Sequence, residues 1–212
     1  MGLYSGSMTG KQFFYYDDLP VNPFQFTAKF RESIEEHRIC PIEVKENVRV
    51  GASGWCHPTN GSREFEVDEY AVDQGFVLGY RVDEKKIPAT TLRFCLNSAI
   101  EAMKEGSGET KPRLPKKVRD AVREQLTDEL MRHALPTTKM FEVYFNTNDK
   151  VITLFASSRA VHDKFRATFR DTFGFPIFAR NAGTLCVQEA ANADALEPYF
   201  DIIPATFVAG GQ

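Results

Sequence analysis

The feature that most constrains the fold is a hairpin pattern, KMFEVYFNTNDKVITLFASS, at residues 139–158. Two arms rich in aromatic and β-branched residues flank Asn146 to Asp149, and a polar turn between two such runs predicts an antiparallel hairpin. The segment SRAVHDKFRATFRDTFG follows at once and predicts a helix that ends at Gly174, since glycine favours the left-handed conformation after a helix.

The other strands and helices also arrive in groups and not in strict βαβ alternation, which favours the α+β class. Asn22 is a candidate cap for a helix in which Phe26, Phe30 and Ile34 share one face. Further elements are expected as strands at 9–16 and 48–55, a hairpin that turns at 73–75, and helices at 88–105 and 116–134.

A chain of 212 residues is long enough to bury a substantial core in one large or two small units. We expect an N-terminal α+β subdomain at residues 1–87 and a central subdomain of long helices packed on an antiparallel hairpin at 88–180. The central subdomain includes a basic helix, and a short C-terminal segment at 181–212 completes the chain.

The four cysteines form no CxxC pair, which argues against a structural zinc site and suits reduced thiols in a cytosol. No apolar run approaches the length of a membrane span, and the N-terminus lacks the pattern of a secretory signal. The sequence therefore predicts a cytoplasmic protein that has no contact with a membrane.

The segment KPRLPKKVRDAVREQLTDELMRHALP at residues 111–136 is basic, although the whole chain has a net charge of −3. From Lys111 to Lys139 there are eight basic and four acidic residues, an excess of four, so the rest of the chain sums to −7. Its helix is expected to carry three faces, because successive residues are about 100° apart. These faces are an inward one (Val118, Ala121, Val122, Gln125, Leu126), an acidic one (Asp120, Glu124, Asp128) and a basic one (Lys116, Arg119, Arg123).

Charge alone leaves the role of the basic face open. It is either a solvated helix face or a surface for a row of phosphates, extended by Lys111 and Arg113 from the preceding loop. A second basic helix, with Arg159, Lys164, Arg166 and Arg170, could border the same groove.

Several segments in order resemble the recombination-associated protein RdgC family, over roughly Met8 to Ile177. They begin with GKQFFYYDDLP and a Gly54-Trp55 pair with Pro58 close behind. KKIPATTLRFCLNSAIEAM, the basic segment, and the hairpin with its following helix complete the series. The order and spacing of these segments carry the resemblance, since none of them is a catalytic motif.

The resemblance implies a homodimer that binds double- and single-stranded DNA with little sequence preference and modulates RecA-dependent recombination at the nucleoid. In that family two chains form a ring around DNA, and members continue past the end of this chain. Three assemblies therefore stay open for this chain: an open dimer, a differently closed dimer, or a clamp that needs a partner. The expected DNA-binding residues are Lys111, Arg113, Lys116, Lys117, Arg119, Arg123, Lys85, Lys86, Arg166 and Arg170.

Two other functions stay open, a Mg²⁺-dependent exonuclease and a module that binds an acidic protein partner. Candidate carboxylates for a nuclease are Asp17-Asp18 and an alternating set, Glu64, Glu66 and Asp68, on an expected strand. His37, Cys40, Cys56 and His57 could share a metal, although the histidines of the chain lie far apart in sequence. Phe13, Phe14, Tyr15, Tyr16 and Trp55 could stack single-stranded bases, although one face of that first strand must be core. We expect no catalytic residue, metal or cofactor.

Overall fold

The structure, a computed structural model, describes residues 9–16, 21–22, 25–42, 51–72, 75–107 and 115–192. Its centre is a seven-stranded antiparallel sheet accompanied by helices, which confirms the α+β class. The strand order is β4 (Gly51–Cys56), β6 (Gly75–Lys85), β7 (Pro136–Asn146), β8 (Val151–Leu154), β1 (Lys11–Phe14) and β9 (Phe178–Ala179), and β5 (Ala71–Val72) pairs with β6. The sheet takes strands from both sides of residue 87, the expected subdomain boundary.

The hairpin expected from the sequence is confirmed as β7 and β8. Val143 pairs with Leu154 and Asn146 with Val151, and the turn residue Lys150 has a φ of 53°. The Asn146 side chain accepts a hydrogen bond of 3.0 Å from the backbone N–H of Asp149, the local bond that makes asparagine favourable in turns. The register places Val143, Phe145, Ile152 and Leu154 together in the core.

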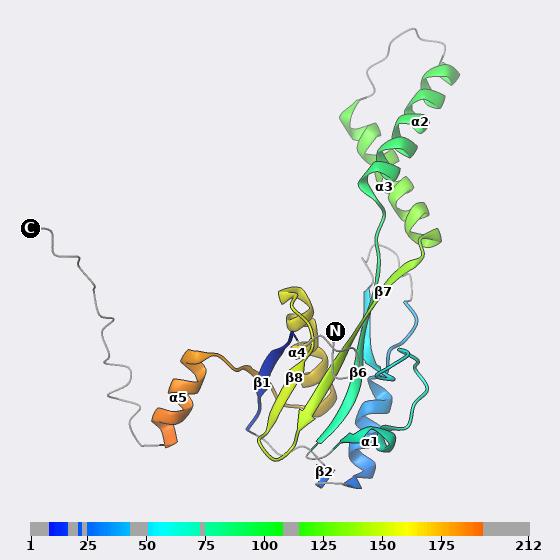
Figure 1. The fold of residues 1–212 in the computed structure, drawn as a ribbon. Coiled ribbons are helices and arrows are strands. Elements are labelled where there is room, and N and C mark those ends of the chain that lie inside the picture. The colour runs from blue at the N-terminus through cyan, green and yellow to red at the C-terminus, as the bar shows by residue number, and fades with distance from the viewer. Residues whose placement is uncertain are drawn as a thin grey trace, which may run out of the picture.

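Helices α1 (Ala28–Glu36) and α4 (Arg159–Phe173) supply the other side of that core (Figure 1). Phe165 and Phe169, one turn apart on α4, are fully buried. Phe165 contacts Trp55 and Tyr80 of the sheet, and Phe169 contacts Phe165 and Phe145. The Trp55 indole N–H donates a 2.9 Å hydrogen bond to the Thr172 hydroxyl, so the helix is fixed by a polar bond as well as by packing. Gly174, with φ 83°, ends α4 as expected.

The helices α2 (Ala89–Ser107) and α3 (Lys116–His133) form an antiparallel pair, which we call the arm. Figure 1 shows the arm projecting beyond the ends of β6 and β7, away from the rest of the sheet. Leu96 of α2 and Val122 of α3 are the buried residues of the pair among its described side chains. The expected inward face of α3 is therefore only partly right, because Val118, Ala121 and Gln125 are exposed on an arm that packs against a single partner helix.

Several local expectations were wrong. Thr27, and not Asn22, caps α1 by accepting a hydrogen bond from the N–H of Phe30, while Asn22 lies in a two-stranded sheet of β2 (Val21–Asn22) and β3 (Gln25–Phe26). The stretch around Glu64 and Glu66 is a loop followed by the 3₁₀ helix η1 (Val67–Tyr70), not a strand. The Arg38 guanidinium holds this loop by donating to the Phe65 carbonyl and lying over the Phe65 ring.

The described region after α4 contains one further strand, β9 (Phe178–Ala179), and one further helix. Arg180 follows β9, and α5 (Ala182–Asn192) begins two residues later. The Thr184 hydroxyl accepts from the Asn181 N–H, and the Asn181 side chain accepts from the Thr184 N–H, a reciprocal cap at the start of α5. None of the helices in the described ranges combines the length and the apolar character needed to cross a membrane.

Candidate nucleic-acid interface

The first turns of α3 carry a concentration of positive charge. Lys116, Lys117, Arg119 and Arg123 are all exposed. The helix begins after Pro115, which provides no side-chain cap, and its first turn contains no acidic residue. The backbone dipoles of a helix place a partial positive charge at its N-terminus, where acidic side chains are normally favoured. Here the basic side chains add to the positive charge of the helix N-terminus. This repulsion destabilises the first turn of α3 and favours the binding of an anion beside it.

Lys116, Arg119 and Arg123 form one stripe along α3, which we call the basic stripe. Among the described residues, none of the three forms an ion pair with a carboxylate. At about 100° per residue, Lys117 falls outside this stripe and on the side of Asp120 and Glu124. From Lys116 to Arg123 the stripe covers seven steps along the helix, or about 10 Å at a rise of 1.5 Å per residue.

Lys85 and Lys86 lie at the opposite end of α3, where the arm joins the sheet. The Lys85 ammonium donates to the carbonyls of Met131 and Arg132, at 3.4 and 3.3 Å, and so binds the C-terminal end of α3. An 18-residue helix is about 27 Å long, so this lysine is a full helix length from Lys116. Lys85 therefore has a structural partner in the last turn of α3 and lies far from the basic stripe.

Glu84 joins Lys86 of the same strand end to Lys164 of α4. Its carboxylate is 2.7 Å from the Lys86 ammonium and forms a second, close contact with Lys164. Hydrogen bonds from Lys164 and then Lys86 lower the pKa of Glu84 to about 2. The three residues line a hollow of about 500 Å³ between the arm and the sheet. Two of the basic residues near this junction thus share one carboxylate, and the three side chains together keep a net charge of +1.

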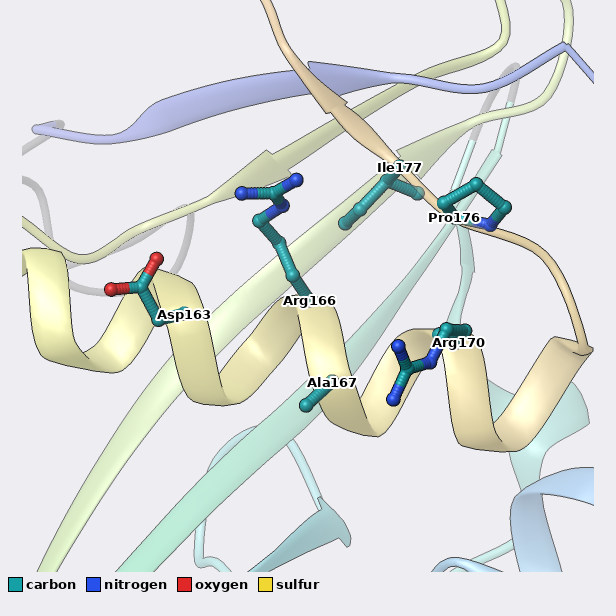
Figure 2. Close-up of a pocket in the computed structure, with 6 residues that line it drawn as sticks. All are labelled: Asp163, Arg166, Ala167, Arg170, Pro176 and Ile177. Atoms are coloured by element: carbon teal, nitrogen blue, oxygen red, sulfur yellow. The ribbon is translucent and has the colours of Figure 1, made fainter.

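Arg166 and Arg170 lie on exposed positions of α4, one turn apart. They line a shallow hollow of about 220 Å³ together with Asp163, Pro176 and Ile177 (Figure 2). Arg170 is 3.6 Å from the Asp171 carboxylate, but both side chains are more than half exposed and water weakens the pair. This pair of arginines is a second exposed cationic surface, on the sheet-bound helix and not on the arm.

The expected DNA-binding residues therefore lie in three places. The α3 lysines and arginines are near the far end of the arm, Lys85 and Lys86 are at its base, and Arg166 and Arg170 are on α4. Lys111 and Arg113 lie outside the described residues. The structure brings the basic stripe together and leaves it exposed, whereas the lysines at the base of the arm have partners within the chain.

Residues 16–186 match the profile of a protein family described as "Putative exonuclease, RdgC". The chain belongs to the RdgC family. The resemblance carried by the ordered segments is confirmed, and the matched region contains the arm, α4 and most of the sheet.

Two curated relatives support the RdgC assignment. A recombination-associated protein RdgC from Tolumonas auensis is 24% identical over 181 residues, which are 82% of this chain and 57% of the relative. Another from Paraburkholderia phymatum is 27% identical over 143 residues, which are 64% of this chain and 44% of the relative. The chain spans about half the length of these relatives.

The RdgC family description includes the word exonuclease, and acidic residues are the ones that would form a nuclease site. A two-metal or one-metal nuclease needs converging carboxylates. Glu64 and Glu66 are exposed in the loop before η1, and Asp17 and Asp18 lie outside the described residues. In the part of the chain that the structure describes, no three His, Cys, Asp or Glu side chains are grouped closely enough to hold a metal ion.

The histidines and cysteines considered from the sequence have other partners. His57 shares hydrogen bonds with the Tyr70 hydroxyl, at 2.6 Å, and with Thr59. Cys56 beside it is fully buried, and burial raises the pKa of its thiol to about 12. A thiol with such a pKa stays protonated and is a poor nucleophile at neutral pH. His37 bonds to the Ser33 carbonyl and Cys40 to the Arg38 carbonyl.

Sequence reasoning missed Glu84 as the partner of two lysines. It stands in the stretch VDEKK, where local alternation gives no sign of a contact with Lys164, a residue 80 positions away. Of the aromatic residues at 13–16, Phe13 and Tyr15 are core, as one face had to be, and Trp55 is core as well. Tyr16 is exposed, and its surroundings are considered below.

Proposed function

We propose that this protein binds DNA through its phosphate backbone, with little dependence on sequence. The observation that supports this most strongly is the basic stripe, which lies exposed beside the uncapped start of α3 with no carboxylate paired to it among the described residues. Three cations along about 10 Å can meet about three phosphates, since phosphates of one strand are 3.4 Å apart along the axis of a duplex. Each contact releases condensed counterions and adds affinity without reading a base.

The curated relatives are named recombination-associated proteins, and we extend a role in recombination to this chain. We infer that it acts as a homodimer at the nucleoid, holds double- or single-stranded DNA, and modulates RecA-dependent strand exchange. The arm supports this inference physically, because a projecting helix pair can reach around a duplex while the sheet stays compact (Figure 1). The net charge of −7 outside residues 111–139 repels DNA from other surfaces and directs it to the basic ones.

We favour binding over catalysis. The described carboxylates form no group that could hold a metal ion, whereas the three exposed cations of the basic stripe share one face of α3. The exonuclease of the family description remains the second candidate, and capture of an acidic protein surface by the basic stripe is the third.

Fluorescence anisotropy of a labelled duplex tests the proposal with a triple variant, Lys116→Glu, Arg119→Glu and Arg123→Glu. A matched control reverses three exposed cations elsewhere, Lys29, Arg31 and Arg63, so that both variants change the net charge equally. We expect wild type and control to bind at low salt and the stripe variant to lose binding. Equal affinities for all three proteins would refute the role of the stripe. The same duplex incubated with Mg²⁺ and run on a gel distinguishes the nuclease, which would shorten it.

A further inference from the structure

Three aromatic rings gather at the β1–β9 edge of the sheet, which we call the edge cluster: Phe14, Tyr16 and Phe178. Phe14 stacks on Phe178 with 5.6 Å between ring centroids, and the Tyr16 ring is 5.3 Å from Phe14 and 5.6 Å from Phe178. Phe14 is buried, whereas Tyr16 is 60% exposed and Phe178 is 37% exposed. The buried ring of Phe14 thus supports the exposed rings of Tyr16 and Phe178.

The edge cluster lies on the sheet face opposite to α4. Phe14 pairs directly with Phe178, while Phe13 pairs with Ala179 and points into the core with α4. Side chains alternate between the two faces of a strand, so Phe14 and Phe178 must lie on the other face. Strand β9 is the last in the order of the sheet, at the side where β1 is seen in Figure 1. The rings therefore stand at an edge and not in the seam between sheet and helices.

Cationic groups flank these rings. Arg180 is two residues beyond Phe178, and its guanidinium donates to the Gln12 side chain at 3.3 Å, beside Phe14 on the same face. Two residues along a strand correspond to about 6.6 Å. On the other side, the Lys150 ammonium donates to the Tyr16 carbonyl at 3.2 Å.

We propose that Tyr16 and Phe178 form a stacking platform for an unpaired base of single-stranded DNA, with Arg180 and Lys150 meeting the phosphates on either side of that base. The inference rests on the proposed DNA-binding function and adds to it a second site with a different chemistry. The basic stripe recognises only charge, whereas the edge cluster requires a base with an accessible ring face. A paired base in a duplex does not offer that face.

The chemistry of the edge cluster distinguishes this occupant from a protein. Aromatic rings interleaved with cations are the arrangement by which proteins hold single strands without sequence preference. An apolar protein partner would need a larger continuous patch, since stable interfaces bury about 800 Å² on each side. A platform of two exposed rings suits one or two bases.

The test uses the full chain and two fluorescent strands of about 15 nucleotides, within the range that single-strand sites occupy. One strand is oligo-dT, and the other has the same number of phosphates with abasic residues in place of bases. The variants are Tyr16→Ala and Phe178→Ala. Tyr16→Phe keeps the ring, and Phe94→Ala removes a ring that is 65% exposed on α2, distant in sequence from the edge cluster.

We expect wild type to prefer oligo-dT over the abasic strand by roughly tenfold, the effect of about one stacked base. Tyr16→Ala and Phe178→Ala should each remove most of this preference and leave the affinity for the abasic strand and for duplex unchanged. Tyr16→Phe and Phe94→Ala should behave as wild type. A thermal melt followed by the fluorescence of Trp55 confirms that each variant is folded.

The outcomes separate this inference from the proposed function. If duplex and both strands fail to bind wild type, the proposed function is wrong and the platform with it. If they bind but wild type does not distinguish oligo-dT from the abasic strand, only the platform is wrong. Loss of a dimer in sedimentation of Tyr16→Ala, with the base preference retained, would show that the rings face protein and would also overturn the inference.

Discussion

Neutralising the basic stripe is the perturbation whose effect on DNA binding can be worked from the structure. In the variant Lys116→Gln, Arg119→Gln and Arg123→Gln, three phosphate contacts are lost. Each contact contributes about 0.9 to the slope of log affinity against log salt, so the slope should become shallower by about 2.7. A second variant, Arg166→Gln with Arg170→Gln, removes the exposed pair on α4 and should reduce the slope by about 1.8 if α4 borders the same DNA.

These slopes decide whether the arm acts alone or together with α4. If only the basic stripe contacts DNA, raising salt from 50 to 200 mM lowers wild-type affinity by about 40-fold, because a fourfold change in salt is raised to the power 2.7. If the arginines of α4 also take part, five contacts give a power of about 4.5 and a loss of about 500-fold. The two cases are easily distinguished by anisotropy titrations of a labelled duplex.

The combined five-residue variant tests additivity, since distant and independent contacts should add. A control with Lys29→Gln, Arg31→Gln and Arg63→Gln corrects for the change in net charge. A stripe variant that keeps the wild-type slope would refute the reasoning, because it would mean that no phosphate lies against Lys116, Arg119 or Arg123.

Three further predictions concern stability, each measured by urea unfolding followed by the fluorescence of the single tryptophan, Trp55. Glu84→Gln should destabilise the protein at pH 7 by about 0.5–1 kcal/mol. The pKa of Glu84 is about 2 in the folded protein and its ordinary value is 4.5, so its stabilising contribution is complete above pH 4.5. The difference in stability between wild type and variant should therefore shrink as the pH falls towards 2. A difference that stays constant with pH would contradict the pairing. Thr172→Val leaves the buried indole N–H of Trp55 without its acceptor and should cost about 1–3 kcal/mol, whereas Thr172→Ser should cost much less; equal losses would mean that the bond contributes nothing. Gly174→Ala should cost about 1–2 kcal/mol from its φ of 83° alone, because no atom lies within 4 Å of the added methyl group, and an unchanged midpoint would show that the helix end can relax.

The parts of the fold that the sequence predicts well are those determined by neighbouring residues. The β7–β8 turn follows from Asn146 and Asp149, which bond to each other, and the end of α4 follows from Gly174. The start of α1 was misplaced because Asn22 and Thr27 are both good caps, and only the pairing of Asn22 with Gln25 in β2–β3 decides between them. The local sequence therefore indicates that a helix forms in this region, but it does not decide which of two suitable residues caps it.

The parts that could not be predicted depend on contacts between distant residues. The pairing of β1 with β8 and β9 joins the two ends of the described chain, and it alone creates the edge cluster from Phe14, Tyr16 and Phe178. Likewise, the sequence shows Lys86 and Lys164 as cations available for DNA, but folding brings both to Glu84. A count of basic residues cannot reveal which of them already have a carboxylate partner within the chain.

The most direct test of the central claim is a titration of the unmodified protein with two labelled duplexes of unrelated sequence at several salt concentrations. Binding through phosphates predicts closely similar affinities for the two sequences and a linear fall of log affinity with log salt. Absence of binding at low salt, or an affinity that does not change with salt, would contradict the claim that this chain holds DNA by its backbone.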